Sequence, residues 1–339
     1  LADQGIAIEM VEKDYVIAFG NKKQADDIKK SGRMITSFEY LSRPLDFPKK
    51  DERFHNYNEL TQALKDLTQK YPDLVELTSI GKTHENRDIW ALRISENVKT
   101  DRGNKPAVVF MGGHHAREHL SMEIPLMLAQ HLLAETTAQN QSIVRLLASR
   151  EIHIIPCVNP DGAEWDISTG SYKMWRKNRS TNYDQTKGVD LNRNYGFGWG
   201  TGGSSKDPDS ETYMGTAPFS EPESLAIKNY VEGAKNISIL LSFHTFSELI
   251  LYPWGHVYDA IPAQQDRLVH ENMARTMAAW NGYTPQQSSD LYIASGDTTD
   301  WSYGEHKIIS FTFELDPKSM WNGGFYPGQG VIQSVFNKN

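Results

Sequence analysis

The sequence predicts an α/β fold, a mixed, mostly parallel twisted sheet with helices on both faces (α/β/α), preceded by a small α+β segment. Short apolar runs alternate with stretches of helical periodicity over most of the 339 residues. These runs are apolar at nearly every position, which is typical of strands buried on both faces of a sheet. A polar stretch with two prolines, residues 43–51, separates the first 45 residues from the rest. We therefore expect two domains, residues 1–45 and 46–339.

The N-terminal segment has the pattern of a small α+β unit. Apolar and polar residues alternate at its start, and after a second apolar run a polar, helix-favouring stretch ends at Gly32. The charges and prolines of residues 43–51 then predict an exposed linker. The segment is expected to contain strands at residues 6–10, 15–19 and 34–40 and a helix at residues 22–30.

Helices and strands alternate in the main domain. Leu60, Leu64, Leu67 and Tyr71 have helical spacing. Residues 220–223, Ser-Glu-Pro-Glu, have capping-box spacing with a proline in the first turn, which predicts the start of another helix. Strands are expected at residues 88–94, 107–111, 152–158, 237–243, 249–252 and 308–313, and a further helix at residues 122–134.

Charge and composition disfavour several classes of protein. The chain has 35 basic and 43 acidic residues and a net charge of −8, whereas nucleic acids and anionic membrane surfaces require a basic face. No segment approaches the roughly 18 consecutive apolar residues of a membrane-spanning helix. The single cysteine, Cys157, excludes an intrachain disulfide and a thiolate metal site. Any metal site would therefore use nitrogen and oxygen ligands.

Three groups suited to metal binding or acid–base chemistry follow predicted strands. The strand at residues 107–111 leads through two glycines to His115 and Glu118, a later strand ends at His244, and the last ends at Glu314. Ligands bind at the carboxyl ends of strands in such sheets, so these groups are expected to share one crevice. Two imidazoles and one carboxylate are a catalytic zinc set that leaves a fourth position for water, with Glu314 as a free base. Structural histidines held by hydrogen bonds are the alternative.

A second metal-binding pattern uses some of the same residues. His115-Ala116-Arg117-Glu118-His119 also fits H-x-x-E-H, in which both histidines bind zinc and the glutamate is the base. That motif needs both histidines one turn apart within a helix. Two glycines precede this segment and the helical pattern begins only near Leu120, which disfavours the motif here.

The order of six motifs resembles the zinc metallocarboxypeptidases of the carboxypeptidase A and B type, especially secreted bacterial members such as carboxypeptidase T. The resemblance extends from about Asp46 to the C-terminus, with closely similar spacing. The motifs are Gly-His-His-Ala-Arg-Glu at 113–118, Asn-Pro-Asp-Gly at 159–162, Trp-Arg-Lys-Asn-Arg at 175–179, Asp-Leu-Asn-Arg-Asn at 190–194, Ser-Phe-His-Thr-Phe-Ser at 242–247 and Phe-Thr-Phe-Glu-Leu at 311–315.

The resemblance implies one Zn²⁺ per chain, held by His115, Glu118 and His244, with Glu314 as general base for the attacking water. These roles agree with those inferred from the strand ends. Zinc would activate the water and polarise the substrate carbonyl.

Five further roles follow from the same resemblance. Arg176 would polarise the scissile carbonyl and stabilise the developing oxyanion, and Asp190 would orient a zinc histidine. Asn192 and Arg193 would bind the free α-carboxylate of the substrate, for which a planar guanidinium is suited. Tyr292 would close over the substrate.

The specificity residues are matched by position in the same way. Members that select Lys or Arg have an acidic residue where this chain has Thr299, and Asp297 stands two residues earlier, as in bacterial members with dual specificity. The resemblance thus implies broad specificity, with Arg117 as a further substrate-binding residue. The alternative is that Asp297 only caps its loop. Phe246 replaces a family tyrosine near an outer subsite, which removes a hydroxyl but no metal ligand.

Other expectations concern the periphery of the molecule. Residues 1–45 stand where these enzymes carry an inhibitory pro-segment, so they resemble the remnant of one; the alternative is a subdomain that only aids folding. Asp51, Glu52 and Glu59 resemble a peripheral Ca²⁺ site of bacterial relatives. Residues 331–336 match only the first turns of a longer closing helix, so the C-terminal helix is expected to be incomplete.

The predicted protein is a secreted, monomeric zinc exopeptidase that acts on the C-termini of peptides or proteins and not on nucleic acids or membranes. Two alternatives remain open at this stage. One is a relative that hydrolyses cell-wall peptides or another amide, and the other is a zinc-bearing binding module without turnover. The presence of Glu314, Arg176 and Tyr292 disfavours the binding module.

Overall fold

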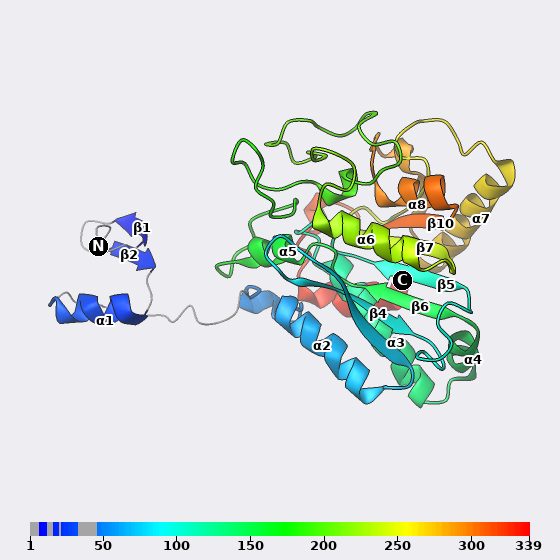
Figure 1. The fold of residues 1–339 in the computed structure, drawn as a ribbon, viewed down its shortest axis with the longest axis horizontal. Coiled ribbons are helices and arrows are strands. Elements are labelled where there is room, and N and C mark those ends of the chain that lie inside the picture. The colour runs from blue at the N-terminus through cyan, green and yellow to red at the C-terminus, as the bar shows by residue number, and fades with distance from the viewer. Residues whose placement is uncertain (1–6, 12–15, 20–21, 33–45) are drawn as a thin grey trace. The chain divides into compact units, whose positions relative to one another are not determined.

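The computed structural model describes residues 7–11, 16–19, 22–32 and 46–339. The chain divides into two compact units, Leu1–Pro44 and Leu45–Asn339. In the first unit, strands β1 (Ala7–Val11) and β2 (Val16–Phe19) pair in antiparallel fashion, and helix α1 (Lys22–Lys30) follows. These elements agree with the predicted ones (Figure 1). The strand predicted at residues 34–40 lies outside the described residues.

The described part of the second unit is built on an eight-stranded mixed sheet with the order β3-β4-β6-β5-β7-β10-β8-β9. The four central strands, β6, β5, β7 and β10, are parallel. Strands β3 and β4 are antiparallel at one edge, and β8 runs antiparallel to β10. The strands are β3 (Val75–Lys82), β4 (Asp88–Ile94), β5 (Ala107–Met111), β6 (Glu151–Ile155), β7 (Ile237–Thr245), β8 (Leu249–Tyr252), β9 (Thr284–Gln287) and β10 (Ile309–Leu315).

Helices cover both faces of this sheet, as Figure 1 shows. Alternate residues of a strand point to opposite faces. On β5, Val109 and Met111 pack with α6 and α8, while Val108 and Phe110 pack with α3. The predicted α/β/α class is confirmed. The helices of this unit are α2 (Tyr57–Lys70), α3 (Leu120–Thr137), α4 (Gln141–Ser149), α5 (Pro160–Ile167), α6 (Pro222–Gly233), α7 (Gln264–Asn281), α8 (Thr298–His306) and α9 (Ile332–Lys338).

Two sequence predictions about local structure are wrong. The linker is not exposed along its whole length, because Phe47 is buried in the core and Asp51 is buried with its carboxylate accepting from the Tyr172 hydroxyl. Burial of Phe47 anchors this segment on the second unit. The capping box at residues 220–223 does not form either, although the helix predicted from this pattern does begin there. Helix α6 begins at Pro222, and the Ser220 hydroxyl contacts Glu221 and Asn194 instead of capping the helix.

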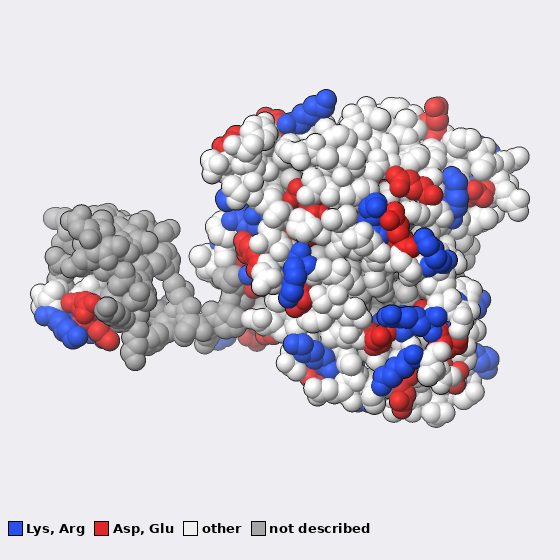
Figure 2. All heavy atoms as spheres, in the orientation of Figure 1, with Lys and Arg blue, Asp and Glu red and all other residues white. Residues whose placement is uncertain are grey.

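The surface of the second unit carries charges of both signs. Figure 2 shows Lys and Arg interspersed with Asp and Glu on the face in view, without a large patch of one sign there. Within the described residues, no helix is both long and apolar enough to cross a membrane.

Gly112 allows the end of β5 to approach the start of α3. A Cβ atom added at this residue would lie only 1.9 Å from the carbonyl oxygen of Ser121. The backbone of Gly112 donates to Ile155 O and accepts from Val158 N, so the same residue ties β5 to the segment after β6. The loop that follows, residues 113–119, is thereby fixed at the carboxyl end of the central strands.

We predict that Gly112→Ala destabilises the protein and displaces this loop, because neither backbone segment can yield without losing hydrogen bonds. The expected loss is about 1–3 kcal/mol in the free energy of unfolding, measured with denaturant. Gly233→Ala is the matched control, since an added Cβ there meets no atom within 4 Å. Equal stability of the two variants would contradict this account of Gly112.

Candidate active site

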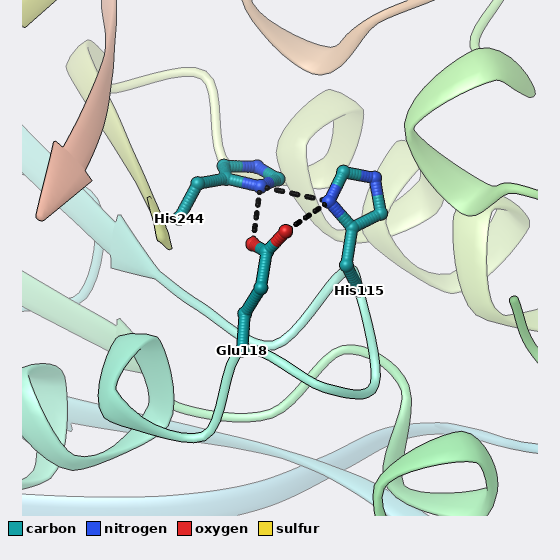
Figure 3. A group of neighbouring side chains, drawn as sticks. All are labelled: His115, Glu118 and His244. Atoms are coloured by element: carbon teal, nitrogen blue, oxygen red, sulfur yellow. Dashed lines mark hydrogen bonds and ion pairs between the residues drawn. The ribbon is translucent and has the colours of Figure 1, made fainter. Parts of the chain in front are cut away.

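His115, Glu118 and His244 converge in the structure, as Figure 3 shows. His115 and Glu118 lie in the loop between β5 and α3, and His244 lies near the end of β7. The Nδ1 atom of His115 is 2.8 Å from Glu118 Oε1, and that of His244 is 2.9 Å from Glu118 Oε2. The two Nδ1 atoms are 3.2 Å apart. All three side chains are buried.

The chemistry of these donor atoms fits a bound cation. His115 Nε2 lies 3.1 Å from Asp190 Oδ1, and a carboxylate can only accept, so the ring proton is assigned to Nε2. Nδ1 of His115 then presents a lone pair to His244 Nδ1 and to the Glu118 carboxylate. Several acceptor atoms facing one another in a buried place are unfavourable unless a cation lies between them. Two imidazole nitrogens and one carboxylate suit zinc.

Asp190 links the cluster to Arg176. Its Oδ2 accepts from Arg176 Nε at 2.9 Å and from Nη2 at 2.7 Å, while its Oδ1 faces His115. The remaining nitrogen, Arg176 Nη1, lies 3.3 Å from His115 Nδ1. A single buried carboxylate thus orients both an imidazole and a guanidinium. This arrangement suits the orienting role expected of Asp190.

Glu314 stands next to His244 in the sheet. The two residues are register partners on the parallel strands β10 and β7, so their side chains project from the same face. The Glu314 carboxylate accepts no hydrogen bond from any residue that the structure describes. Burial, and next the negative charge of Glu118, raise the pKa of Glu314 well above its ordinary value. An unpaired carboxyl with this tendency is suited to accept a proton.

The charges of the other groups balance one another in the buried site. Burial alone would raise the pKa of Asp190, but the charges of Arg176 and His115 hold it well below its usual range. Burial would likewise raise the pKa of Glu118, and the two neighbouring imidazoles lower it. Burial lowers the pKa of His244. These shifts favour carboxylates and a neutral His244, the protonation states that metal binding requires.

Asn192 and Arg193 present donors that the protein leaves unused. Asn192 Oδ1 accepts from the backbone and hydroxyl of Thr298, which turns the amide so that Nδ2 is available. Arg193 is held through Nε on Gly203 O and Nη1 on Asn192 O. Within the described residues, Asn192 Nδ2 and Arg193 Nη2 have no hydrogen-bond partner. Tyr292 is 51% exposed, and its ring centre is 5.9 Å from the Arg193 guanidinium.

The expected specificity residues are partly engaged by the protein itself. Asp297 is the N-cap of α8: its Oδ1 accepts from Asp300 N and from the Thr299 hydroxyl. Burial, and next the charge of Asp300, raise the pKa of Asp297 to about 7. Arg117 contacts Glu211 and stacks on Phe325, whose ring also packs against Phe246.

His119 does not join the cluster. Helix α3 begins only at Leu120, so the two histidines of the alternative motif are not one turn apart in a helix. The Nε2 atom of His119 lies 2.8 Å from Asp166 Oδ2, and its ring packs on Phe47. This geometry disfavours the H-x-x-E-H arrangement.

Two of the three acids of the expected Ca²⁺ site, Asp51 and Glu59, accept from protein donors, and the third, Glu52, is exposed. Asp51 accepts from Tyr172 and Gln329, and Glu59 completes a capping box with Asn56 at the start of α2. Within the described residues, the ligand atoms of these acids do not lie close enough together to form a metal-binding group. Calcium binding stays a prediction.

Sequence reasoning missed His114. Its ring stacks on that of His244 with centroids 5.5 Å apart, and its Nε2 lies 2.9 Å from the Tyr195 hydroxyl. His114 is fully buried, and burial lowers its pKa well below the usual value. The pair His114-His115 is visible in the sequence, but spacing alone cannot tell which imidazole enters the cluster and which one packs beside it.

Comparison with known proteins identifies the family that the chain resembles. Residues 60–339 match the family model described as zinc carboxypeptidase. The chain is 42% identical over 302 residues to a zinc carboxypeptidase of Saccharothrix mutabilis subsp. capreolus, covering 87% of this chain and 69% of that protein. It is 31% identical over 338 residues to carboxypeptidase A1 of Rattus norvegicus, covering 98% and 76%.

Two solved structures are similar along most of their length. Bovine thrombin-activatable fibrinolysis inhibitor in complex with tick carboxypeptidase inhibitor aligns with a TM-score of 0.75 at 30% identity, covering 84% of this chain and 93% of that one. Carboxypeptidase A from Helicoverpa armigera aligns with a TM-score of 0.74 at 25% identity, covering 99% and 89%.

We predict that His244→Ala abolishes zinc binding in the cluster and that His119→Ala retains it. The reason is that His244 places a ring nitrogen beside Glu118, whereas His119 contacts Asp166 instead. Zinc competition titrations of the two purified variants against a chromophoric chelator would measure the difference in affinity. Loss of zinc in His119→Ala with retention in His244→Ala would favour the H-x-x-E-H arrangement instead.

Proposed function

This chain belongs to the zinc carboxypeptidase family and is a C-terminal exopeptidase, and we propose that it releases both large hydrophobic and basic C-terminal residues. In this proposal zinc is held by His115, Glu118 and His244. The observation that supports this proposal is the convergence of the ligand cluster with an unpaired Glu314 at the carboxyl ends of β7 and β10. A zinc ion in the cluster would polarise the scissile carbonyl and lower the pKa of the attacking water toward about 7.

The surrounding side chains divide the remaining work. Glu314 takes the proton of the attacking water and delivers it to the nitrogen of the leaving residue, so the carboxyl ends the cycle as it began. Arg176, which Asp190 holds in place, presents positive charge to the negative charge that develops on the oxygen of the scissile carbonyl. Fixed groups need no reorganisation during the reaction, which lowers its barrier.

The substrate's α-carboxylate is bound by Asn192 and Arg193. Their free donors, Nδ2 and Nη2, supply a neutral and a charged hydrogen bond, and Tyr292 lies beside them on the exposed side. Binding of a free carboxylate selects the last residue of a peptide. Closure of Tyr292 over that residue would exclude water from the site.

Broad specificity rests on Asp297 and Thr299. Thr299 brings no charge to the base of the pocket, which accommodates an apolar side chain. Asp297 uses one carboxylate oxygen for the cap, and its Oδ2 accepts no hydrogen bond from the described residues. A Lys or Arg side chain that reaches Oδ2 would favour the ionised form of a group whose pKa is raised to about 7.

Further proposals concern the setting of the enzyme. We propose that the protein is secreted, acts as a monomer, and carries in residues 1–45 the remnant of an inhibitory pro-segment. The support for them is the resemblance of the chain to secreted bacterial members of the family and the separate compact unit at its start.

We predict that Glu314→Gln keeps its zinc and loses turnover. An amide has the shape of the carboxyl group but cannot accept the proton, so kcat should fall roughly 10²–10⁴-fold. Hydrolysis of a blocked dipeptide ending in Phe, measured together with zinc content, tests this. Glu52→Gln, a change at an exposed acid, is the control. Normal turnover in Glu314→Gln would contradict the role of Glu314.

A second prediction concerns Asp297→Asn. Asparagine retains the cap of α8 but not the charge, so kcat/KM for dipeptides ending in Lys or Arg should fall roughly 10–100-fold, while Phe and Leu substrates change little. Steady-state kinetics on these four substrates provide the test. An equal loss on all four would make Asp297 a purely structural residue, and no cleavage of any of them by the wild type would refute the proposed specificity.

A further inference from the structure

A second group of metal-ligating side chains lies beside the edge strand β3, separate from the cluster of His115, Glu118 and His244. It consists of His84, Glu221 and Glu223, and one ligand atom from each lies within 4.8 Å of the others. His84 is in the turn between β3 and β4, Glu221 is the N-cap residue of α6, and Glu223 is in the first turn of that helix.

Close packing of α6 on β3 brings the three side chains together. A Cβ atom added at Gly81 would lie 2.7 Å from the Cβ of Ala226, so only glycine permits this approach. Gly81 lies near the end of β3, three residues before His84, and Ala226 lies about one helical turn after Glu223 in α6. The contact therefore fixes the β3–β4 turn over the start of α6.

The hydrogen bonds of the group leave one carboxylate oxygen unused. His84 Nε2 lies 2.9 Å from Glu221 Oε2, and Asn178 Nδ2 donates to Glu221 Oε2 at 2.7 Å and to Glu223 Oε2 at 3.0 Å. Glu223 is 0% exposed, yet its Oε1 has no hydrogen-bond partner among the described residues. A buried acceptor without a partner costs free energy that a bound ligand would recover.

The charges of the group are also unbalanced. The two buried carboxylates have one amide, one hydroxyl, that of Ser220, and one imidazole as side-chain partners. Arg87 is already paired with Glu85 and Asp161. A proton on Glu223 would remove the charge but would leave Oε1 without a hydrogen bond to an acceptor of the described chain. A divalent cation would supply both charge and ligation.

We propose that His84, Glu221 and Glu223 bind a second divalent cation of the zinc class, independent of the proposed function of the chain. Imidazole nitrogen together with carboxylate oxygen suits zinc, whereas calcium takes oxygen ligands. The exposed side of His84 provides access and leaves room for water in the remaining coordination position. The ion would link the β3–β4 turn to α6 and stabilise this edge of the sheet.

Another group, Glu232, Glu305 and His306, is a poorer candidate. Lys228 Nζ lies 3.1 Å from Glu232 Oε2 and already compensates its charge, and Glu305 is exposed. Glu305 also accepts from Trp301 Nε1. His306 therefore serves as the matched histidine for a control variant.

The test measures zinc bound per chain at micromolar free Zn²⁺ in the full chain. We expect two equivalents in the wild type and in His306→Ala, one in His84→Ala, one in His244→Ala, and none in the double variant His84→Ala/His244→Ala. Zinc should raise the unfolding temperature of His244→Ala but not that of the double variant. His84→Ala should hydrolyse peptides as fast as the wild type, because it spares the central cluster.

Several outcomes would overturn the second site. These are one equivalent in the wild type, two in His84→Ala, loss of an equivalent in His306→Ala with none lost in His84→Ala, or stabilisation of His244→Ala by Ca²⁺ and not by Zn²⁺. Glu223→Gln provides an independent check, since it should also bind one equivalent. Absence of peptidase activity in every variant, with the predicted zinc counts, would refute the proposed function and leave the second site standing.

Discussion

The parallel register of β5, β7 and β10 is the constraint on which the site depends. It places Glu314 beside His244 and brings the loop after β5 to the same end of the sheet. Because register partners on parallel strands project from the same face, a shift of one residue would turn one of the two side chains into the opposite core. The apolar residues on either side of Glu314, Phe313 and Leu315, are buried and resist such a shift.

The second requirement is that the buried charges be supplied in compensating sets. Asp190 illustrates this, because its two oxygens hold a guanidinium and an imidazole at once. Removing either partner would leave a charge without compensation in a place that water does not reach, which costs far more than a surface ion pair is worth. The same reasoning distinguishes the central cluster from the edge group, where the buried Oε1 of Glu223 has no hydrogen-bond partner within the described residues.

Sequence patterns recovered the elements whose side chains are mostly apolar. Strands β4, β5 and β8 agree with the predicted bounds, because burial on both faces leaves an apolar signal at most positions. Strand β9, Thr-Pro-Gln-Gln, has no such signal, since it is an edge strand stabilised by pairing with β8. Burial of Asp51 could not be predicted either. Its partners Tyr172 and Gln329 are distant in the chain, and the charges and prolines of residues 43–51 predicted exposure to solvent. For the site, strand ends indicated which residues meet. Spacing alone did not separate His114 from His115, and the structure brings His115 into the cluster, as the resemblance implied.

Preference for a chain terminus follows from how Asn192 and Arg193 are held in the proposed site. Thr298 fixes the amide of Asn192, and the backbone oxygens of Gly203 and Asn192 fix the guanidinium of Arg193. Their two free donors are therefore held in place before a substrate binds, which limits the loss of side-chain entropy on binding. A terminal carboxylate satisfies both donors and neutralises the cation. A peptide that continues past this point would bring a neutral carbonyl in place of the carboxylate. The buried charge of Arg193 would then be poorly compensated, which disfavours binding of internal peptide bonds.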